Sequence, residues 1–284
     1  ELFNVDVIDG ISITAALIKL VGTEYTVSDA ASDDATAGSD ITLSGAVSLL
    51  ADTSVSLNSA DNINDTISFT STVSGGAHSL HLAAHSGSVN LAGQASNLSR
   101  FEVSSAALVE MASVNSLDDI SITATEIKLA GTEYAVTDLS SDDATAGSDI
   151  QFTGVVTLLN DVAIRLHHSD AVNDEIIFNG SVEGGAYDLN LDAGSYGVID
   201  MSGSISSLAD LNIIDSNGVQ FSQSVSVHSI NIADTVSNKR VEFQADVDAV
   251  SLITTINGYD LQFDEDITLS EDVIFQAIGD LTLG

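Results

Sequence analysis

The chain has 284 residues, with 42 acidic against 6 basic side chains, a formal net charge of −36, and neither cysteine nor proline. This charge argues against nucleic acid and anionic membrane surfaces as partners, and the lack of cysteine excludes disulfides and thiolate metal sites. The hydrophobic fraction of 44% is enough for a core, but no apolar run reaches the roughly 18 residues of a membrane-spanning helix, so no membrane insertion is expected.

A long tandem repeat organises the chain. The decapeptide Ser-Asp-Asp-Ala-Thr-Ala-Gly-Ser-Asp-Ile occupies residues 32–41 and, letter for letter, residues 141–150. The correspondence predicts one continuous solenoid over residues 1–284, whose units pack against their neighbours. It comprises repeat 1 (1–109), repeat 2 (110–219) and a partial, diverged repeat 3 (220–284). Because the chain opens inside a repeat, we expect it to be a piece of a longer protein.

A shorter period lies inside the long one. An apolar residue, a usually polar residue and a second apolar residue recur thirteen times, at spacings of 18 to 26 residues. In chain order the pairs are Ile18/Leu20, Ile41/Leu43, Ile67/Phe69, Val89/Leu91, Val109/Met111, Ile127/Leu129, Ile150/Phe152, Ile176/Phe178, Ile199/Met201, Val219/Phe221, Val241/Phe243, Leu261/Phe263 and Leu281/Leu283. Alternation with a period of two indicates strands with one buried face. We therefore predict two columns of stacked core residues, which begin at Ile18 and at Leu20.

Each short unit holds two or three such strands in about 22 residues. This leaves no room for the crossover of a dozen or more residues that joins parallel strands of an open sheet. Coiling each unit into one turn resolves the difficulty, because equivalent residues then stack about 4.8 Å apart. The sequence predicts an all-β fold, a right-handed parallel β-helix (solenoid) of about 13 rungs, with five rungs per 109–111-residue repeat. At that spacing it would form a rod of roughly 60 Å.

Acidic corners between the strands are the best candidates for a ligand site. They comprise Asp33, Asp34, Asp40, Asp61, Asn64 and Asp65 in repeat 1, and Asp142, Asp143, Asp149, Asp170, Asn173 and Asp174 in repeat 2. Stacked carboxylates repel, and calcium, which prefers such oxygen ligands, would relieve the repulsion. However, neither the EF-hand spacing nor the Gly-Gly-x-Gly-x-Asp nonapeptide occurs, and Asp and Asn also suit solvated turns. Calcium sites and plain turns both stay open, and no other cofactor is indicated.

Signals for catalysis are weak, and we predict that the chain is not an enzyme. A glycosidase needs two or more carboxylates across a groove. The most divergent segment, residues 234–256, adds only Asp246, Asp248 and the basic pair Lys239-Arg240.

Binding surfaces have few candidates in the sequence. Exposed aromatic side chains would mark a carbohydrate-binding patch, and the candidates are Tyr187, Tyr196 and Tyr25, the last repeated as Tyr134. The group His78, His81 and His85 has no histidine counterpart in repeat 2, so surface positions are expected for it.

Two segments of repeat 2 resemble a known class of repeat. Asp-Ile-Gln-Phe-Thr-Gly-Val-Val-Thr-Leu at 149–158 and Ile-Phe-Asn-Gly-Ser-Val-Glu-Gly-Gly at 177–185 are similar to the repeat regions of giant bacterial surface proteins, the filamentous-haemagglutinin-like adhesins and exoproteins. The resemblance extends over the whole chain through its composition. It implies a secreted β-helical stalk or adhesive fibre, located outside the cell or on the bacterial surface, and it supplies no functional residue to carry over.

We therefore predict a non-catalytic structural rod or stalk segment of a secreted bacterial surface adhesin or extracellular fibre. Its partners would be neighbouring repeats of the same protein and other copies, joined end to end through exposed rung edges. Two alternatives stay open: a carbohydrate- or host-binding adhesin module that engages a glycan or host surface, and a calcium-stabilised scaffold.

Overall fold

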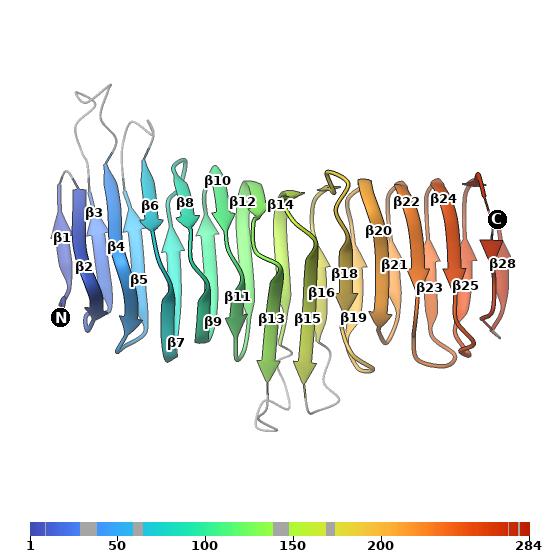
Figure 1. The fold of residues 1–284 in the computed structure, drawn as a ribbon, viewed down its shortest axis with the longest axis horizontal. Coiled ribbons are helices and arrows are strands. Elements are labelled where there is room, and N and C mark those ends of the chain that lie inside the picture. Colours follow the sequence, from blue (N-terminus) through green and yellow to red (C-terminus); the bar gives the residue numbers. More distant parts are fainter. Residues whose placement is uncertain are drawn as a thin grey trace. The chain divides into compact units, whose positions relative to one another are not determined.

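The computed structural model describes residues 1–8, 10–28, 39–58, 65–138, 148–168, 174–271, 273–277 and 279–284. Within these ranges the chain is all-β, a parallel β-solenoid of about 11 turns with 28 strands and no helix (Figure 1). The predicted all-β parallel solenoid is confirmed, while the count of 13 rungs is not. The strands divide between two compact units, residues 1–131 and 132–284.

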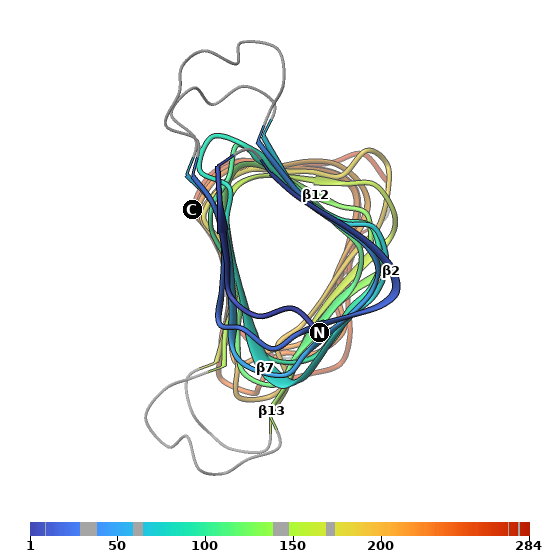
Figure 2. The ribbon, with the colours of Figure 1, turned by 90° about the vertical axis from the view of Figure 1, so that its left-hand side faces the viewer.

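The first unit coils around three sides, and its strands pair in parallel from one coil to the next. Its strands are β1 (Val5–Val7), β2 (Gly10–Leu20), β3 (Glu24–Val27), β4 (Asp40–Leu49), β5 (Thr53–Leu57), β6 (Thr66–Phe69), β7 (Val73–Ala83), β8 (Ser88–Leu91), β9 (Ala95–Ser105), β10 (Leu108–Met111), β11 (Val114–Ser116) and β12 (Ile120–Leu129). In the end-on view of Figure 2, β2, β7 and β12 follow different parts of a closed outline.

Apolar columns line the inside of these three sides. The first side stacks Ile11, Ile41, Ile67, Val89, Val109 and Ile127. The second stacks Ile18, Val47, Val73, Ala95 and Val114. The third stacks Tyr25, Val55, Leu82, Val103 and Ile122. All of these side chains are buried, which agrees with the alternation in the sequence.

Both predicted columns begin at the wrong residue. Ile18 and Leu20 pair with Val47 and Leu49 on the second side. It is Ile11 and Ile13 that pair with Ile41 and Leu43 on the first side. The eleven-residue strand β2 bends between Thr14 and Leu17, where its register shifts, so it covers two sides of one coil. Both ends of β2 carry the same apolar-x-apolar pattern, and the sequence does not distinguish which end continues the column.

The long repeat does not return to the same side of the first unit. Ile11 lies on the first side, whereas its copy Ile120 lies on the third side, beside Phe101. From Ile11 the first side recurs at Ile41, Ile67, Val89 and Val109, and two further sides lead from Val109 to Ile120. One repeat here spans four coils and two sides of a fifth, so the predicted five rungs per repeat do not hold in this unit.

The second unit also winds through three sides, with parallel pairing between coils. Its strands are β13 (Glu133–Asp138), β14 (Ile150–Leu158), β15 (Val162–His168), β16 (Glu175–Phe178), β17 (Val182–Glu183), β18 (Leu189–Asp192), β19 (Val198–Met201), β20 (Ile205–Asp215), β21 (Val219–Phe221), β22 (Val225–Ile232), β23 (Arg240–Phe243), β24 (Val247–Thr254), β25 (Asp260–Phe263), β26 (Ile267–Leu269), β27 (Val273–Ile274) and β28 (Leu281–Leu283).

Aromatic rings fill one inner column of this unit, as the sequence predicted. The column is Phe152, Phe178, Met201, Phe221, Phe243 and Phe263, all of them buried. The rings of Phe221 and Phe243 stack with centroids 4.6 Å apart, and those of Phe243 and Phe263 with centroids 4.9 Å apart. This spacing follows from the coil repeat of about 4.8 Å, which brings identical rings into offset stacking distance.

Glycines occupy one corner of the second unit because the coils approach closely there. Gly154 has φ 137°, a conformation that L side chains rarely adopt. A Cβ built on Gly180 would overlap the carbonyl group of Gly154, and one built on Gly203 would overlap the carbonyl group of Gly180. Backbone therefore lies directly on backbone at this corner, and no side chain fits between.

Candidate functional site

Four of the twelve predicted calcium ligands lie within the described residues: Asp40, Asp65, Asp149 and Asp174. The other eight, Asp33, Asp34, Asp61, Asn64, Asp142, Asp143, Asp170 and Asn173, lie outside them. The described four form two equivalent pairs, one in each unit. Each pair joins a residue at the start of one coil to a residue at the start of the next.

In the first unit these carboxylates accept backbone N–H groups in a reciprocal arrangement. Asp40 Oδ1 accepts the N–H of Thr66 at 2.9 Å, and Asp65 Oδ1 accepts the N–H of Ser39 at 2.7 Å. Each aspartate thus binds the residue beside the other, and we call this arrangement the Asp40–Asp65 clasp. Asp65 is only 2% exposed, so its hydrogen bond satisfies a carboxylate that burial would otherwise destabilise.

The second unit repeats the clasp. Asp149 Oδ1 accepts the N–H of Glu175 at 2.9 Å, and Asp174 Oδ1 accepts the N–H of Ser148 at 2.8 Å. Asp174, like Asp65, is 2% exposed. The repeated sequence therefore specifies a backbone function for these aspartates, namely fastening consecutive coils on either side of a connecting segment.

Burial and a neighbouring charge both affect the carboxyl of Asp40 in the first clasp. Burial raises the pKa of Asp40 above its usual range, and the nearby charge of Asp65 raises it further, against the lowering effect of the Thr66 N–H. Two carboxylates held this close make a local negative potential that a bound cation would relieve. Across the described ranges no group of three or more Asp, Glu or His side chains is arranged to hold a metal ion.

Further aspartates use the same hydrogen bond, and the sequence analysis missed them. In each case Oδ1 accepts the N–H of the residue that follows one coil later. The pairs are Asp52 with Ser79 (2.9 Å), Asp161 with Asp188 (3.1 Å), Asp188 with Asp210 (3.1 Å) and Asp260 with Asp280 (2.8 Å). In the sequence, each of these aspartates stands at the first position of a strand or just before it. The residue that donates the N–H follows about one coil later in the sequence.

Asp188 provides a test of this pattern by pH. Burial raises its pKa, and the charges of Asp210 and Asp161 raise it further, while the hydrogen bond from the Asp210 N–H lowers it. A carboxyl whose pKa is higher in the folded state than in the unfolded state lowers the free energy of unfolding once it ionises. This cost is absent at a pH below the pKa in the unfolded state, and it is complete at a pH above the pKa in the folded state.

We expect Asp188→Asn to raise the melting temperature at pH 7, because asparagine keeps the acceptor oxygen and removes the charge. The gain should disappear near about pH 3, where the carboxyl of the unmodified protein is protonated. Thermal unfolding followed by circular dichroism at both pH values checks this. The control Asp248→Asn, on an exposed outer position, should change the melting temperature little, and an equal gain from both variants would contradict the local explanation.

His81 on β7 and His85 just after it contact neighbouring coils. The ring nitrogens of His81 lie 3.2 Å from Ser54 Oγ and 2.8 Å from Ser104 Oγ, on the coils before and after it. His85 Nε2 lies 3.2 Å from Asn58 Oδ1 of the preceding coil. These contacts place the two rings on the outer face with partners already supplied by the chain.

Two of the predicted binding tyrosines are accessible and one is not. Tyr25 is buried, and its hydroxyl donates to the carbonyl of Leu2 at 2.6 Å while it accepts the N–H of Gly22 at 2.9 Å. Its role is structural, which corrects the prediction for that residue. Tyr187 and Tyr196, in contrast, are 37% and 49% exposed.

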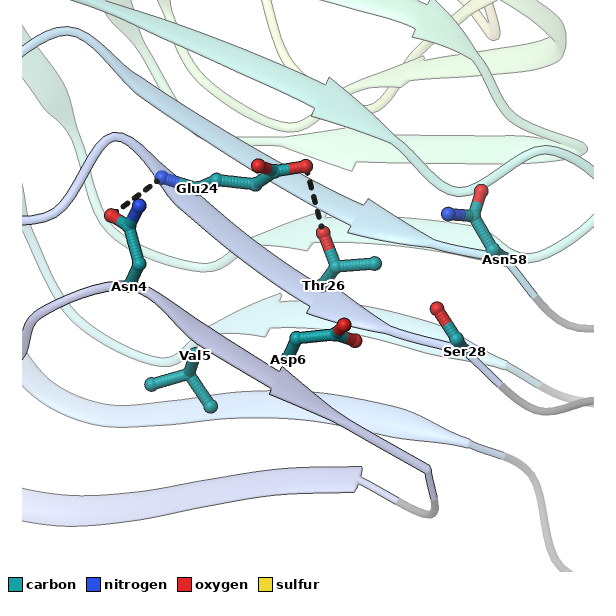
Figure 3. Close-up of a pocket in the computed structure, with 7 residues that line it drawn as sticks. All are labelled: Asn4, Val5, Asp6, Glu24, Thr26, Ser28 and Asn58. Carbon is teal, nitrogen blue, oxygen red and sulfur yellow. Dashed lines mark hydrogen bonds between the residues drawn. The ribbon is translucent and has the colours of Figure 1, made fainter.

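A polar groove of about 360 Å³ lies on the outer face of β1, β3 and β5 (Figure 3). Its lining residues are Asn4, Val5, Asp6, Glu24, Thr26, Ser28 and Asn58. Several of them hold one another: Asn4 Oδ1 accepts the N–H of Glu24 at 3.2 Å, and Thr26 Oγ1 donates to Glu24 Oε1 at 3.5 Å. The groove offers carboxylate and hydroxyl oxygens to a hydroxylated ligand and contains no aromatic ring.

A second hollow of about 380 Å³ interrupts the outer face of β19, β21 and β23 in the second unit. It lies where Gly218 leaves a position without a side chain, and it includes both acidic groups and the guanidinium of Arg240.

Comparison with known proteins adds no family. No family model, no curated protein and no solved structure matches this chain. In the portion of the chain that the structure describes, no helix is long and apolar enough to cross a bilayer.

Proposed function

We propose that this chain is a non-catalytic structural segment, a rod or stalk of a secreted bacterial surface adhesin or extracellular fibre. The observation that carries the proposal is the parallel pairing within each unit, where every side of a coil is hydrogen-bonded to the same side of the next. Each coil of such a stack contacts only the coils next to it, and each added coil lengthens the stack. These properties suit a spacer. The proposal includes a right-handed coil and a single continuous array.

The charge distribution supports a role in an aqueous extracellular setting. Among the described residues the core columns take apolar side chains, and the acidic side chains other than the buried Asp65 and Asp174 are at least partly exposed. The chain as a whole has a formal charge of −36. High net charge keeps a repetitive β-protein soluble and opposes sideways association of its strands.

Pulling the full chain by its two ends in an optical trap tests the spacer function. A spacer should keep its folded length under load and then extend in discrete steps, each of which releases one or more coils. Phe243→Ala should lower the force of the first step, while the outer-face variant Gln220→Ala should not. Smooth extension at low force, without steps, would contradict a structural role.

End-to-end association of copies is part of the same proposal. Leu281 and Leu283 pair with Leu261 and Phe263 and continue their two apolar columns, so the pairing that joins one coil to the next can be repeated. A strand edge with exposed apolar residues is a template for another strand. Light scattering should therefore show growth with protein concentration, and a strict monomer at high concentration would remove this part of the proposal.

A calcium-stabilised scaffold is the second candidate, and the Asp40–Asp65 clasp favours it. Burial is the main cause of the raised pKa of Asp40, and the charge of Asp65 adds to it. A dication bound beside the clasp, with oxygen ligands such as the predicted Asp33, Asp34, Asp61 and Asn64, would offset the repulsion between the two carboxylates.

Thermal unfolding in EDTA and then in millimolar calcium, at fixed ionic strength, decides between the candidates. Binding would raise the melting temperature with calcium and not with matched magnesium, since the two ions differ in ligand number and geometry. Asp40→Asn would remove that increase. Equal melting temperatures in all three media would leave the aspartates as backbone acceptors only.

A further inference from the structure

The hollow at Gly218 lies along an outer column of the second unit. The column runs through Glu175, Val198, Gly218, Arg240 and Asp260 on successive coils. At the corresponding place in the first repeat, Leu108 lies between Ser88 and Glu126, so a side chain fills the position. The first repeat thus carries a leucine side chain at the position where Gly218 carries none.

The backbone at Gly218 is also distinctive. Its φ is 135°, and a Cβ added there would meet nothing closer than the Arg240 carbonyl oxygen, at 3.6 Å. The position is thus open above its own backbone. At about 4.8 Å per coil, Val198 and Arg240 stand roughly 10 Å apart on either side of it. This gives a notch with a backbone floor, one apolar wall and one cationic wall.

The charges around the notch are of both signs. Arg240 has a half-exposed guanidinium, whose ion pair with Glu242 is long, at 3.8 Å. A guanidinium has five N–H donors and matches a carboxylate in a bidentate fashion, so it retains capacity for a ligand. Glu175 and Asp200 also line the notch. The notch is thus lined by one cation, Arg240, and by three carboxylates. One of them, Glu242, already accepts a hydrogen bond from the side-chain amide of Gln262 at 3.3 Å.

We propose that this notch binds a basic α-amino carboxylate, meaning lysine-like chemistry as a free amino acid or at the C-terminus of a peptide. The ligand carboxylate pairs with Arg240, and its ammonium groups pair with the acidic side chains. A simple anion is disfavoured because the chain as a whole carries a charge of −36. A ligand with one carboxylate and at least one ammonium group, as in C-terminal or free lysine, matches both the local pattern and the overall field. The volume of about 380 Å³ lies within the range of small-molecule sites.

Titration of the full chain with L-lysine, followed by amide NMR, tests the proposal. We expect saturable shifts at Gly218 and Arg240, weaker shifts with cadaverine, which lacks the carboxylate, and none with hexanoate, which lacks the ammonium groups. Repeating the titration with a dipeptide that ends in lysine separates the two sources: equal shifts would indicate recognition of the C-terminus, and weaker shifts would indicate the free amino acid.

Variants make the assignment specific. Arg240→Gln should weaken lysine binding by about tenfold or more, the scale of a charge-assisted hydrogen bond pair. The matched control Arg165→Gln changes another half-exposed arginine, which pairs with Glu133 at 3.4 Å, and it should bind as the unmodified chain does. Glu175→Gln should weaken lysine and cadaverine alike. Absence of saturable shifts, equal binding of cadaverine and lysine, or full binding by Arg240→Gln with a native circular dichroism spectrum would each overturn the proposal.

Discussion

Phe243→Ala should lower the free energy of unfolding by about 3–5 kcal/mol. The ring is 1% exposed and stacks on Phe221 at 4.6 Å and on Phe263 at 4.9 Å. Its removal leaves a cavity between two rings that the coil spacing holds apart, so the neighbours cannot close over it. The solenoid therefore loses both the transfer energy of the ring and its contacts on two faces.

Urea unfolding of the full chain measures this effect, and Gln220→Ala serves as the control. Gln220 is an exposed residue next to Phe221 on β21, and truncation of such a surface side chain changes stability by about 0.5 kcal/mol or less. If Phe243→Ala cost no more than the control, the aromatic column would not be part of the packed interior.

Gly203→Ala should be the second most damaging change, for a different reason. Its Cβ would overlap the carbonyl carbon and oxygen of Gly180 on the preceding coil. The overlap is with backbone rather than with a flexible side chain, so the two coils must separate locally and weaken their ladder. Insertion of a methyl group into a filled site costs about 1–3 kcal/mol, and more where the backbone cannot move.

A second glycine to alanine change controls for the general effect of losing a glycine. At Gly258 the nearest atom to an added Cβ is Ser237 Oγ, at 3.1 Å, the end of a side chain that can rotate away. Gly258→Ala should therefore be tolerated in urea unfolding. Equal stability of the Gly203→Ala variant and the unmodified chain would mean that the coils do not approach at this corner as described.

The sequence predicted the fold class because the solenoid repeats the same local rule many times. Alternation at Ile67-Ser-Phe69 or Val241-Glu-Phe243 needs only the pleat of a strand to place two side chains inside and one outside. The two predicted columns are therefore correct residue by residue in the second unit. In the first unit they are correct from Ile41 onward, and only their first members are wrong, because Ile11 and Ile18 lie at the two ends of one bent strand and carry the same pattern.

The predicted site was recovered only in part, and the reason is physical. Acidic corners are visible in a sequence, but the partner that a carboxylate takes is not. Asp40, Asp65, Asp149 and Asp174 accept N–H groups from residues one coil away, and that contact depends on how the coils stack. The notch at Gly218 was missed because its signal is the absence of one side chain on an outer face, and a sequence does not show which neighbouring side chains leave an opening there.

Disulfide trapping within the first unit tests the parallel, in-register stack most directly, and the chain has no native cysteine to interfere. Ser48, Ser74 and Ser96 follow one another on the outer face, since Ser74 pairs with Ser48 and with Ser96. Adjacent coils place the Cα atoms about 4.8 Å apart, within disulfide range, and two coils place them roughly 10 Å apart, outside it. Under a mild oxidant, Ser74→Cys/Ser96→Cys should form an intramolecular bond, seen by non-reducing mass spectrometry, and Ser48→Cys/Ser96→Cys should not. A bond in the second variant and none in the first would contradict the stack of coils.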